Sequence, residues 1–342
     1  MSTRHRHLLR SMRNRRSLPL MLAGMTVALL AVFSGDATAQ TRRMELADLG
    51  REVGLSSPAI SPDGSRVAVI RSNANYEENR FDRSLLLIEV ENGTERLLTP
   101  GRRRVSSPQW SPSGNRLAFL DTVDDGKTQI YVMPMTAGEA KRVTNVERGV
   151  RSYAWRPDGE ALAFTMTDAA EEREGEERHN KSFEVGDNVY LAQSAPTSAH
   201  IWLVAADGGE PERLTSGEWS VTGFAWAPDG HALAYARQPR PHTGEELNGA
   251  LAVLDLTTGS EREVYRGATA FGAGGARFSP DGALLAFGRS GGNEPFFHPS
   301  HVAVISPSGG EPRVATGDID RNLRGEWLPS GDLLVWGLIS LA

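Results

Sequence analysis

The chain has 342 residues and a formal net charge of −6 at pH 7. It contains no cysteine, which excludes disulfides, thiolate metal sites, cysteine nucleophiles and a lipid-modified N-terminal cysteine. The length permits one large domain or two smaller ones, and 36 glycines with 19 prolines indicate a chain rich in turns.

Residues 1–39 have the pattern of a signal peptide. Six arginines and no acidic residue lie within residues 4–16, and an apolar run follows from Leu18 to Phe33. The small residues Ala37-Thr38-Ala39 then supply a cleavage motif. A membrane anchor is the alternative, but the apolar run is short for a span and leads directly into that motif. We therefore expect cleavage, with Gln40 as the new terminus.

Export predicts a periplasmic or secreted protein that is free of the membrane after cleavage. Arg15-Arg16 leaves the choice between the general secretory route and twin-arginine export open. Removing residues 1–39 leaves 31 basic and 42 acidic residues, a net charge of −11. Such a surface repels phosphate backbones, so we predict no nucleic-acid partner.

Residues 40–56 predict a short helical lead-in, and a repeat fills residues 57–342. The repeat is marked by six turn tetrapeptides whose glycines are spaced by 50, 45, 71, 52 and 49 residues. They are Ser61-Pro-Asp-Gly64, Ser111-Pro-Ser-Gly114, Arg156-Pro-Asp-Gly159, Ala227-Pro-Asp-Gly230, Ser279-Pro-Asp-Gly282 and Leu328-Pro-Ser-Gly331. An apolar and usually aromatic residue precedes each turn, namely Ile60, Trp110, Trp155, Trp226, Phe278 and Trp327.

The residues of the repeat predict β-hairpins. Proline presets the backbone of a type I turn, and glycine accepts the left-handed conformation that closes it. An alternating run after each turn predicts a strand with one face buried, and a second hairpin usually follows. Two hairpins make a four-stranded unit of about 45 residues, the size of a β-propeller blade. We therefore predict an all-β propeller of about five complete blades plus a partial sixth, in an incomplete ring.

The 71-residue spacing marks an insertion in the third blade at about residues 165–199. Its first half, Glu171 to Glu177, is too charged to enter a core and predicts a solvated loop. Its second half, Phe183 to Tyr190, has apolar residues that allow it either to cover one end of the propeller or to remain a surface excursion.

Gly288-Arg-Ser290-Gly-Gly292 fits the G-x-S-x-G pattern of hydrolase nucleophiles. That motif needs a strand before the serine and a helix after it. The strand is predicted from Ala283 to Phe287, but the residues after Ser290 include two prolines and show no helical periodicity. In addition, Gly288 to Ser290 occupies the repeat position filled by Ile70 to Ser72 in the first blade. We therefore interpret Ser290 as structural.

No other residues predict a catalytic, cofactor or metal site. His298 and His301 have no nearby carboxylate on the same face and indicate a surface loop. Asp318 and Asp320 do not form a ligand pattern, and local turn hydrogen bonds account for the aspartates of the repeat. The sequence therefore predicts no catalytic, cofactor-binding or metal-binding residues, and no cofactor.

The repeat resembles the N-terminal propeller of the prolyl oligopeptidase family of serine peptidases, and is most similar to its acylaminoacyl-peptidase-like branch. The resemblance covers residues 41–342. It is carried by Ala59 to Ala68, by Glu77 to Leu85, and most specifically by Ala199 to Gly217. Met44 to Gly50 is similar to the helical lead-in of such enzymes.

The resemblance implies seven or eight blades and a C-terminal α/β-hydrolase domain that carries the catalytic serine, aspartate and histidine. That domain is absent from this chain, so no family catalytic residue can be transferred. The dipeptidyl branch uses a paired-glutamate motif to hold a substrate amine. Tyr76-Glu77-Glu78 is superficially similar to it, although the residues that follow fit the acylaminoacyl-like pattern better.

Two hypotheses of different classes follow. The first is the substrate-gating propeller of an exported serine peptidase that hydrolyses short peptides, with this chain inactive alone and a hydrolase domain as its partner. The second is a stand-alone, TolB-like periplasmic propeller that binds proteins. The second requires ring closure, yet only two strands of the sixth blade are predicted, and open strand edges promote aggregation.

Overall fold

The computed structural model describes residues 45–122, 126–170, 172, 174–180, 182–183, 195–242, 245–267, 275–290, 299–317, 319 and 321–337. The predicted signal peptide lies outside the described residues. A four-residue helix, α2 (Leu46–Leu49), falls within the predicted lead-in. The first strand begins at Val53, so residues 53–56 of that lead-in are extended rather than helical.

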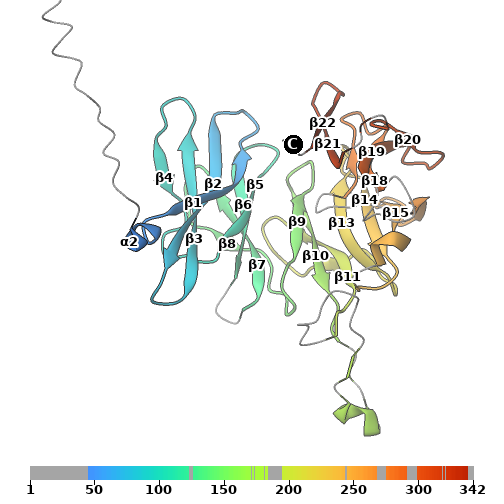
Figure 1. Ribbon diagram of the computed structural model, residues 1–342, viewed down its shortest axis with the longest axis horizontal. Helices are drawn as coiled ribbons and strands as arrows, with labels where there is room; N and C mark the ends of the chain where they lie inside the picture. Colours follow the sequence, from blue (N-terminus) through green and yellow to red (C-terminus); the bar gives the residue numbers. More distant parts are fainter. Residues whose placement is uncertain are drawn as a thin grey trace, which may run out of the picture. The chain divides into compact units, whose positions relative to one another are not determined.

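Five antiparallel sheets of four strands and one of two strands follow one another along the chain. We name them blades 1 to 6 in chain order, and Figure 1 shows them from blue to red. Blade 1 is β1 (Val53–Ile60), β2 (Arg66–Asn75), β3 (Arg80–Glu89) and β4 (Glu95–Leu97); blade 2 is β5 (Ser106–Trp110), β6 (Arg116–Thr122), β7 (Thr128–Pro134) and β8 (Lys141–Arg142); blade 3 is β9 (Ser152–Trp155), β10 (Ala161–Thr167), β11 (Ala199–Ala205) and β12 (Glu212–Arg213).

Blade 4 is β13 (Ser220–Trp226), β14 (Ala232–Gln238), β15 (Ala250–Asp255) and β16 (Glu261–Arg266); blade 5 is β17 (Arg277–Phe278), β18 (Leu285–Ser290), β19 (Ser300–Ile305) and β20 (Arg313–Val314); blade 6 is β21 (Leu323–Trp327) and β22 (Leu333–Gly337). The predicted fold, five complete blades and a partial sixth, is therefore confirmed over the described part of the chain.

All six predicted turns are present between the first two strands of their blades. The glycines that close them have φ values between 70° and 87°. Each glycine N–H donates to the carbonyl oxygen of the first turn residue at 2.8–2.9 Å. In blade 1 the Ser61 hydroxyl donates to Asp63 at 2.5 Å, and this bond is the main reason that the pKa of Asp63 falls to about 2.

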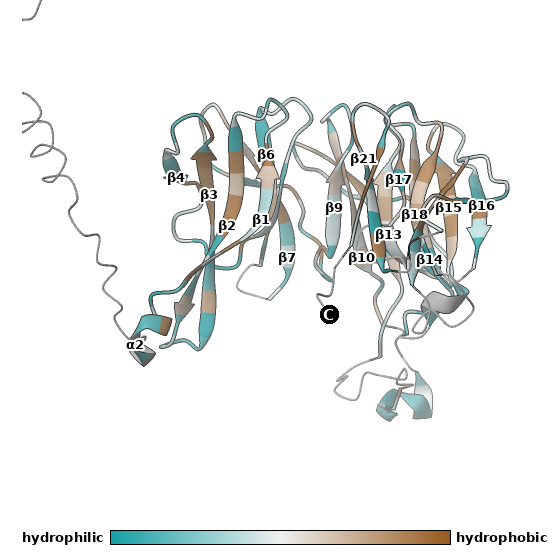
Figure 2. Ribbon diagram, turned by 45° about the horizontal axis from the view of Figure 1, so that its top comes forward, coloured by the Kyte–Doolittle hydropathy of each residue, from teal (hydrophilic) through white to brown (hydrophobic). Residues whose placement is uncertain are grey.

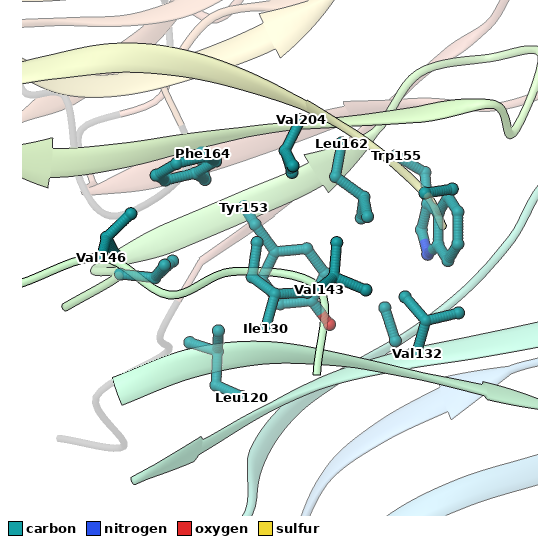
Figure 3. Packing of buried hydrophobic residues seen from close by; sticks show 13 residues of the cluster. Leu120, Ile130, Val132, Val143, Val146, Tyr153, Trp155, Leu162, Phe164 and Val204 are labelled. Atoms are coloured by element: carbon teal, nitrogen blue, oxygen red, sulfur yellow. The ribbon is translucent and has the colours of Figure 1, made fainter. Parts of the chain in front are cut away.

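The hydrophobic core consists of clusters between neighbouring blades. In β6, Leu117 and Phe119 pack with blade 1, whereas Ala118 and Leu120 pack with blade 3. Figure 3 shows the cluster between blades 2 and 3, where Leu120 and other blade 2 side chains meet those of blade 3. The second strand of an inner blade thus buries both faces, so the prediction of one buried face is corrected. Figure 2 shows the result as apolar central strands, such as β2, β3 and β15.

A buried threonine recurs at the end of the fourth strand in four blades. Its hydroxyl accepts a hydrogen bond of 2.8–2.9 Å from a backbone N–H of the third strand, fourteen residues earlier. The four threonines are Thr99, Thr144, Thr215 and Thr316. Each bond satisfies a buried donor at the point where the short fourth strand ends.

The blade 3 insertion lies between β10 and β11. Gly175–His179 forms a single 3₁₀ turn, η1, whose residues are all exposed, where we predicted a solvated loop. The second half of the insertion, from residue 184, lies outside the described residues. A second 3₁₀ turn, η2 (Glu245–Asn248), follows β14. Within the described ranges, no helix has the length and apolarity needed to cross a membrane.

Candidate functional site: a pocket on the inner strands

We call the first strand of each blade its inner strand. Four tryptophan side chains join the inner strands of different blades. The indole N–H of each donates to the backbone carbonyl oxygen that precedes the equivalent residue in the blade before it. The bonds are Trp110 to Ala59 (2.9 Å), Trp155 to Gln109 (3.1 Å), Trp226 to Ala154 (3.3 Å) and Trp327 to Arg277 (3.0 Å). In blade 5 the position is Phe278, which has no N–H to donate. We call this series the indole ladder.

Two arginines add further links at the start of the stack. Arg66 donates to the Gly114 carbonyl oxygen at 3.1 Å, and its guanidinium carbon lies 4.7 Å from the ring centre of Trp110. Arg116 repeats the arrangement one blade later, with 2.5 Å to the Gly159 carbonyl oxygen and 5.3 Å to the ring centre of Trp155. The ladder and these cation–π contacts hold the inner strands in fixed register.

The inner strands of blades 3 and 4 line a cavity of about 890 Å³, which we call the inner-strand pocket. Strands β9 and β13 form most of its wall, and Gln109 of blade 2 and Arg277 of blade 5 complete it. Pro196 and Thr197, at the end of the blade 3 insertion, lie at its margin. The volume is within the range of pockets that hold small ligands or short peptides.

The wall of the pocket is polar and carries positive charge. Hydroxyl and amide groups come from residues such as Ser152, Thr222 and Gln238, while Arg151 and Arg277 are the charged lining residues. Asp, Glu, His and Lys are all absent from the described lining. The pocket can therefore hold a polar ligand, but the lining residues provide no general base for a serine or threonine nucleophile.

Arg277 lies in a crowded environment. Its pKa is lowered from the usual arginine value, chiefly because burial disfavours the charged form, while the nearby carboxylate of Glu326 in blade 6 acts in the opposite direction. By solvent accessibility, however, Arg277 is an exposed residue. Both observations fit a side chain on the wall of a water-accessible pocket, surrounded by protein but not sealed from solvent.

One of the lining residues, the buried Tyr153, joins blades 2 and 3. The Tyr153 hydroxyl donates to the Ser107 carbonyl oxygen at 2.6 Å, and burial raises the pKa of Tyr153 well above its usual value. Gln109 Nε2 donates to the Tyr153 carbonyl oxygen at 2.9 Å. Ser107 has a φ of 52°, in the left-handed region, at a bulge in β5. Tyr153 is thus a structural link and not an acid–base group at neutral pH.

Glycines bring the inner strands of blades 4 and 5 into backbone contact. A Cβ atom added to Gly275 would lie 3.3 Å from the carbonyl carbon of Gly223, and Gly275 has a φ of 57°. A Cβ atom at either position would meet the backbone of the other. The glycine pair therefore allows the close approach of blades 4 and 5 beside the pocket, whose lining includes Gly223.

A second polar cluster lies at the base of the blade 3 insertion. His200 in β11 is fully buried, and its Nε2 lies 3.3 Å from Asp168 Oδ2. Arg213 contacts the same carboxylate oxygen at 3.0 Å, and the ring of Trp219 meets the imidazole edge-on at 5.2 Å. Burial lowers the pKa of His200, with Asp168 opposing and Arg213 adding to the effect. Sequence reasoning missed this cluster because Asp168 and His200 are separated by the insertion.

Of the sequence candidates that the structure describes, Ser290 and His301 do not belong to the pocket lining. Ser290 is the last residue of β18 and pairs with Ser300 of β19. His301 Nδ1 lies 3.0 Å from the Thr316 carbonyl oxygen, and His298 lies outside the described residues, as do Asp318 and Asp320. Over the described ranges no group of three or more acidic or histidine side chains is arranged to hold a metal ion.

The glutamates that resemble the paired-glutamate motif lie in the β2–β3 hairpin. Glu78 is ion-paired with Arg80 at 2.5 Å and with Arg103 at 3.4 Å. Its carboxylate is therefore already neutralised by two arginines of the chain. Trp155 and Trp226 line the pocket and were noted in the sequence as aromatic residues before turns, but the polar residues of the lining were not singled out, because they are scattered over four blades and follow no motif.

Comparisons with known proteins agree with this architecture. Residues 38–185 match PD40, the TolB beta propeller domain. The "Uncharacterized peptidase YuxL" of Bacillus subtilis (strain 168) is 28% identical over 198 residues, which are 55% of this chain and 30% of that protein. The acylaminoacyl peptidase of Pyrococcus horikoshii has a TM-score of 0.60 and 19% identity, with 86% of this chain and 47% of that one covered.

The propeller domain of the Trilobed protease from Pyrococcus furiosus has a TM-score of 0.59 and 15% identity, with 85% of this chain and 79% of that chain covered. The fold therefore defines the chain as a β-propeller protein. The fold is similar to the propellers of these two proteases, and residues 38–185 match the TolB beta propeller domain. The chain spans less than a third of the length of the YuxL relative.

Proposed function

We propose that this chain is the non-catalytic propeller portion of an exported serine peptidase that acts on short peptides. The observation that carries the proposal is the inner-strand pocket, about 890 Å³ in volume, in a propeller whose relatives include a peptidase. The pocket is large enough for a few residues of extended peptide and far too small for a folded protein. In the whole protein, an α/β-hydrolase domain would supply the nucleophile, and the propeller would select what reaches it.

The proposal predicts that the chain alone has no hydrolytic activity, because its pocket lining contains no general base. The purified chain is assayed against acylated amino-acid and dipeptidyl chromogenic substrates, beside a Ser290→Ala variant. We expect no turnover above buffer for either protein. Turnover by the unmodified chain that the Ser290→Ala variant lacks would overturn the proposal.

A TolB-like protein-binding module is the second candidate, and the match of residues 38–185 to the TolB beta propeller domain favours it. The two candidate functions predict different behaviour for the isolated chain in solution. A stand-alone module has to be a soluble monomer that unfolds in one cooperative step, whereas the propeller portion of a larger enzyme leaves apolar blade surfaces uncovered. Sedimentation velocity and calorimetry of the purified chain distinguish them.

A further inference from the structure

We propose that the inner-strand pocket binds the carboxylate of a short peptide through Arg151 and Arg277. The inference deepens the proposed function, because it names the chemical group that the gating propeller recognises. The charge of the pocket lining is opposite to the net charge of the chain. The chain has a net charge of −6, yet the charged side chains of the described pocket lining are two arginines.

The first cation, Arg151, precedes the inner strand β9 of blade 3. Its backbone N–H donates to the Thr165 carbonyl oxygen at 2.9 Å, which fixes the start of the strand. Its side chain is exposed and lines the pocket together with Ser152 and Thr165, whose hydroxyls are 2.7 Å apart. An arginine beside hydroxyl groups can satisfy both oxygens of a carboxylate.

The second cation, Arg277, lies in the inner strand β17 of blade 5. Its backbone is held because its carbonyl oxygen accepts the indole N–H of Trp327 at 3.0 Å. Burial disfavours its charged form, and the nearby acid that offsets this effect, Glu326, does not belong to the pocket lining. An anion in the pocket would stabilise this guanidinium further, because the surroundings screen the interaction less than bulk water does.

The neutral part of the lining favours a peptide over an inorganic ion. Gln109, Gln238, Trp155 and Trp226 line the pocket together with the arginines. Amides can pair with peptide groups, and aromatic rings provide apolar contact for small side chains. A phosphate or chloride ion would use the charges alone and leave most of about 890 Å³ unfilled.

The test measures binding of N-acetyl-Ala-Ala-Ala and of its C-terminal amide to the full chain by calorimetry. A change in the intrinsic tryptophan fluorescence gives a second signal, since two of the seven tryptophans, Trp155 and Trp226, line the pocket. Acetylation removes the amine charge, so the two probes differ only in the carboxylate. We expect the acid to bind at least about tenfold more tightly than the amide, which corresponds to roughly 1.4 kcal/mol.

Substitutions then assign the effect to the two arginines. Arg151→Gln and Arg277→Gln should each weaken binding of the acid about tenfold and leave the amide unchanged. Glu326→Gln should strengthen binding of the acid, because it removes the carboxylate that competes for Arg277. Arg262→Gln, on the exposed outer strand β16, is the matched control and should change nothing. Circular dichroism verifies that each variant is folded, and Arg277→Lys replaces Arg277→Gln if the latter is not.

Equal binding of acid and amide would overturn the carboxylate inference, yet peptide binding in the pocket would still support the proposed function. Unchanged affinity of the acid in both arginine variants would also overturn it. Displacement of the acid by inorganic phosphate at lower concentration than by acetate would instead identify a phosphate site. Failure of both peptides to bind would contradict the inference, whereas the activity assay tests the proposed function separately.

Discussion

At the scale of single residues, each rung of the indole ladder combines burial of an aromatic ring with one hydrogen bond to a neighbouring blade. Trp155 shows both contributions. Its side chain is 7% exposed and belongs to the core between blades 2 and 3, and its N–H reaches the Gln109 carbonyl oxygen. The ring contributes through apolar area, and the N–H fixes one blade against the next.

Trp155→Phe should keep most of the apolar contact and remove the hydrogen bond. We expect the free energy of unfolding to fall by about 1 kcal/mol, the usual contribution of such a bond. Urea titration followed by far-ultraviolet circular dichroism measures the change. Trp202→Phe is the control, because the buried indole N–H of Trp202 has no hydrogen-bond partner among the described residues. An equal loss in the two variants would contradict a specific contribution of the ladder.

His200 predicts a pH dependence of stability. Its pKa in the folded chain is lowered by burial, so the unfolded chain binds a proton that the folded chain does not. The stabilisation is complete above the unfolded pKa of about 6.5 and decreases as pH falls toward the lower folded pKa. The slope from this one group is at most about 1.4 kcal/mol per pH unit.

Unfolding titrations between pH 8 and pH 5 measure this slope. The His200→Asn variant should have a shallower slope than the unmodified chain over that range. His231→Asn is the control, since His231 is exposed in the turn before β14. Parallel pH profiles of the unmodified chain and His200→Asn would contradict the assignment to His200.

Aromatic positions before the turns were found from the sequence, and their burial was expected. The hydrogen bonds of the tryptophans were not expected, because each acceptor is a backbone carbonyl 46 to 72 residues earlier, which no side-chain pattern reveals. The same reason explains why the pocket was missed. Its residues become neighbours only when the inner strands of separate blades meet.

At the scale of the structural element, the glycine of each turn is required by its backbone conformation. Gly159 has a φ of 74°, and a Cβ atom there would meet only ordinary contacts, the nearest being Pro112 Cδ at 3.5 Å. The cost of a side chain at this position is therefore conformational and not steric.

Gly159→Ala should destabilise the chain by about 1 kcal/mol, because alanine is strained in the left-handed region. Gly54→Ala in β1 is the matched control, since Gly54 lies outside that region and its added Cβ would lie 3.5 Å from Ser72 Cβ. We expect Gly54→Ala to be neutral or slightly stabilising. Thermal unfolding of the two variants measures the difference, and similar melting temperatures would contradict it.

Strands and turns were predicted well at this scale because proline, glycine and alternation act locally. One feature was not. The lead-in shortens to Leu46–Leu49 because the residues from Val53 pair with β2. The charged part of the insertion, for which we predicted a solvated loop, contains one 3₁₀ turn whose residues are all exposed.

At the scale of the whole molecule, the blades at the two ends of the series expose apolar side chains that inner blades bury. In blade 1, Leu55 and Ile60 of β1 are 60% and 66% exposed. In blade 6, Leu334 and Trp336 of β22 are 50% and 45% exposed. Large apolar side chains exposed on a terminal blade are typical of an interaction surface or a site of aggregation.

The chain alone should therefore self-associate at micromolar concentration. Ile60→Lys and Leu334→Lys should each shift it toward monomer, because an added charge is costly to bury in an apolar contact. Thr257→Lys, in the exposed turn between β15 and β16, controls for the change in net charge. Sedimentation velocity measures the distribution. A monodisperse monomer for the unmodified chain would contradict the prediction and favour the TolB-like alternative.

The direction of the indole ladder has a consequence for how the protein is made. In every rung the acceptor carbonyl belongs to the earlier blade and the donor to the later one. Synthesis proceeds from the N-terminus, so each newly completed blade finds its acceptor already presented by the blade that left the ribosome before it. The indole ladder can thus extend by one blade at a time onto a surface already formed, whereas the links of Arg66 and Arg116 form only when the next blade supplies its carbonyl oxygen.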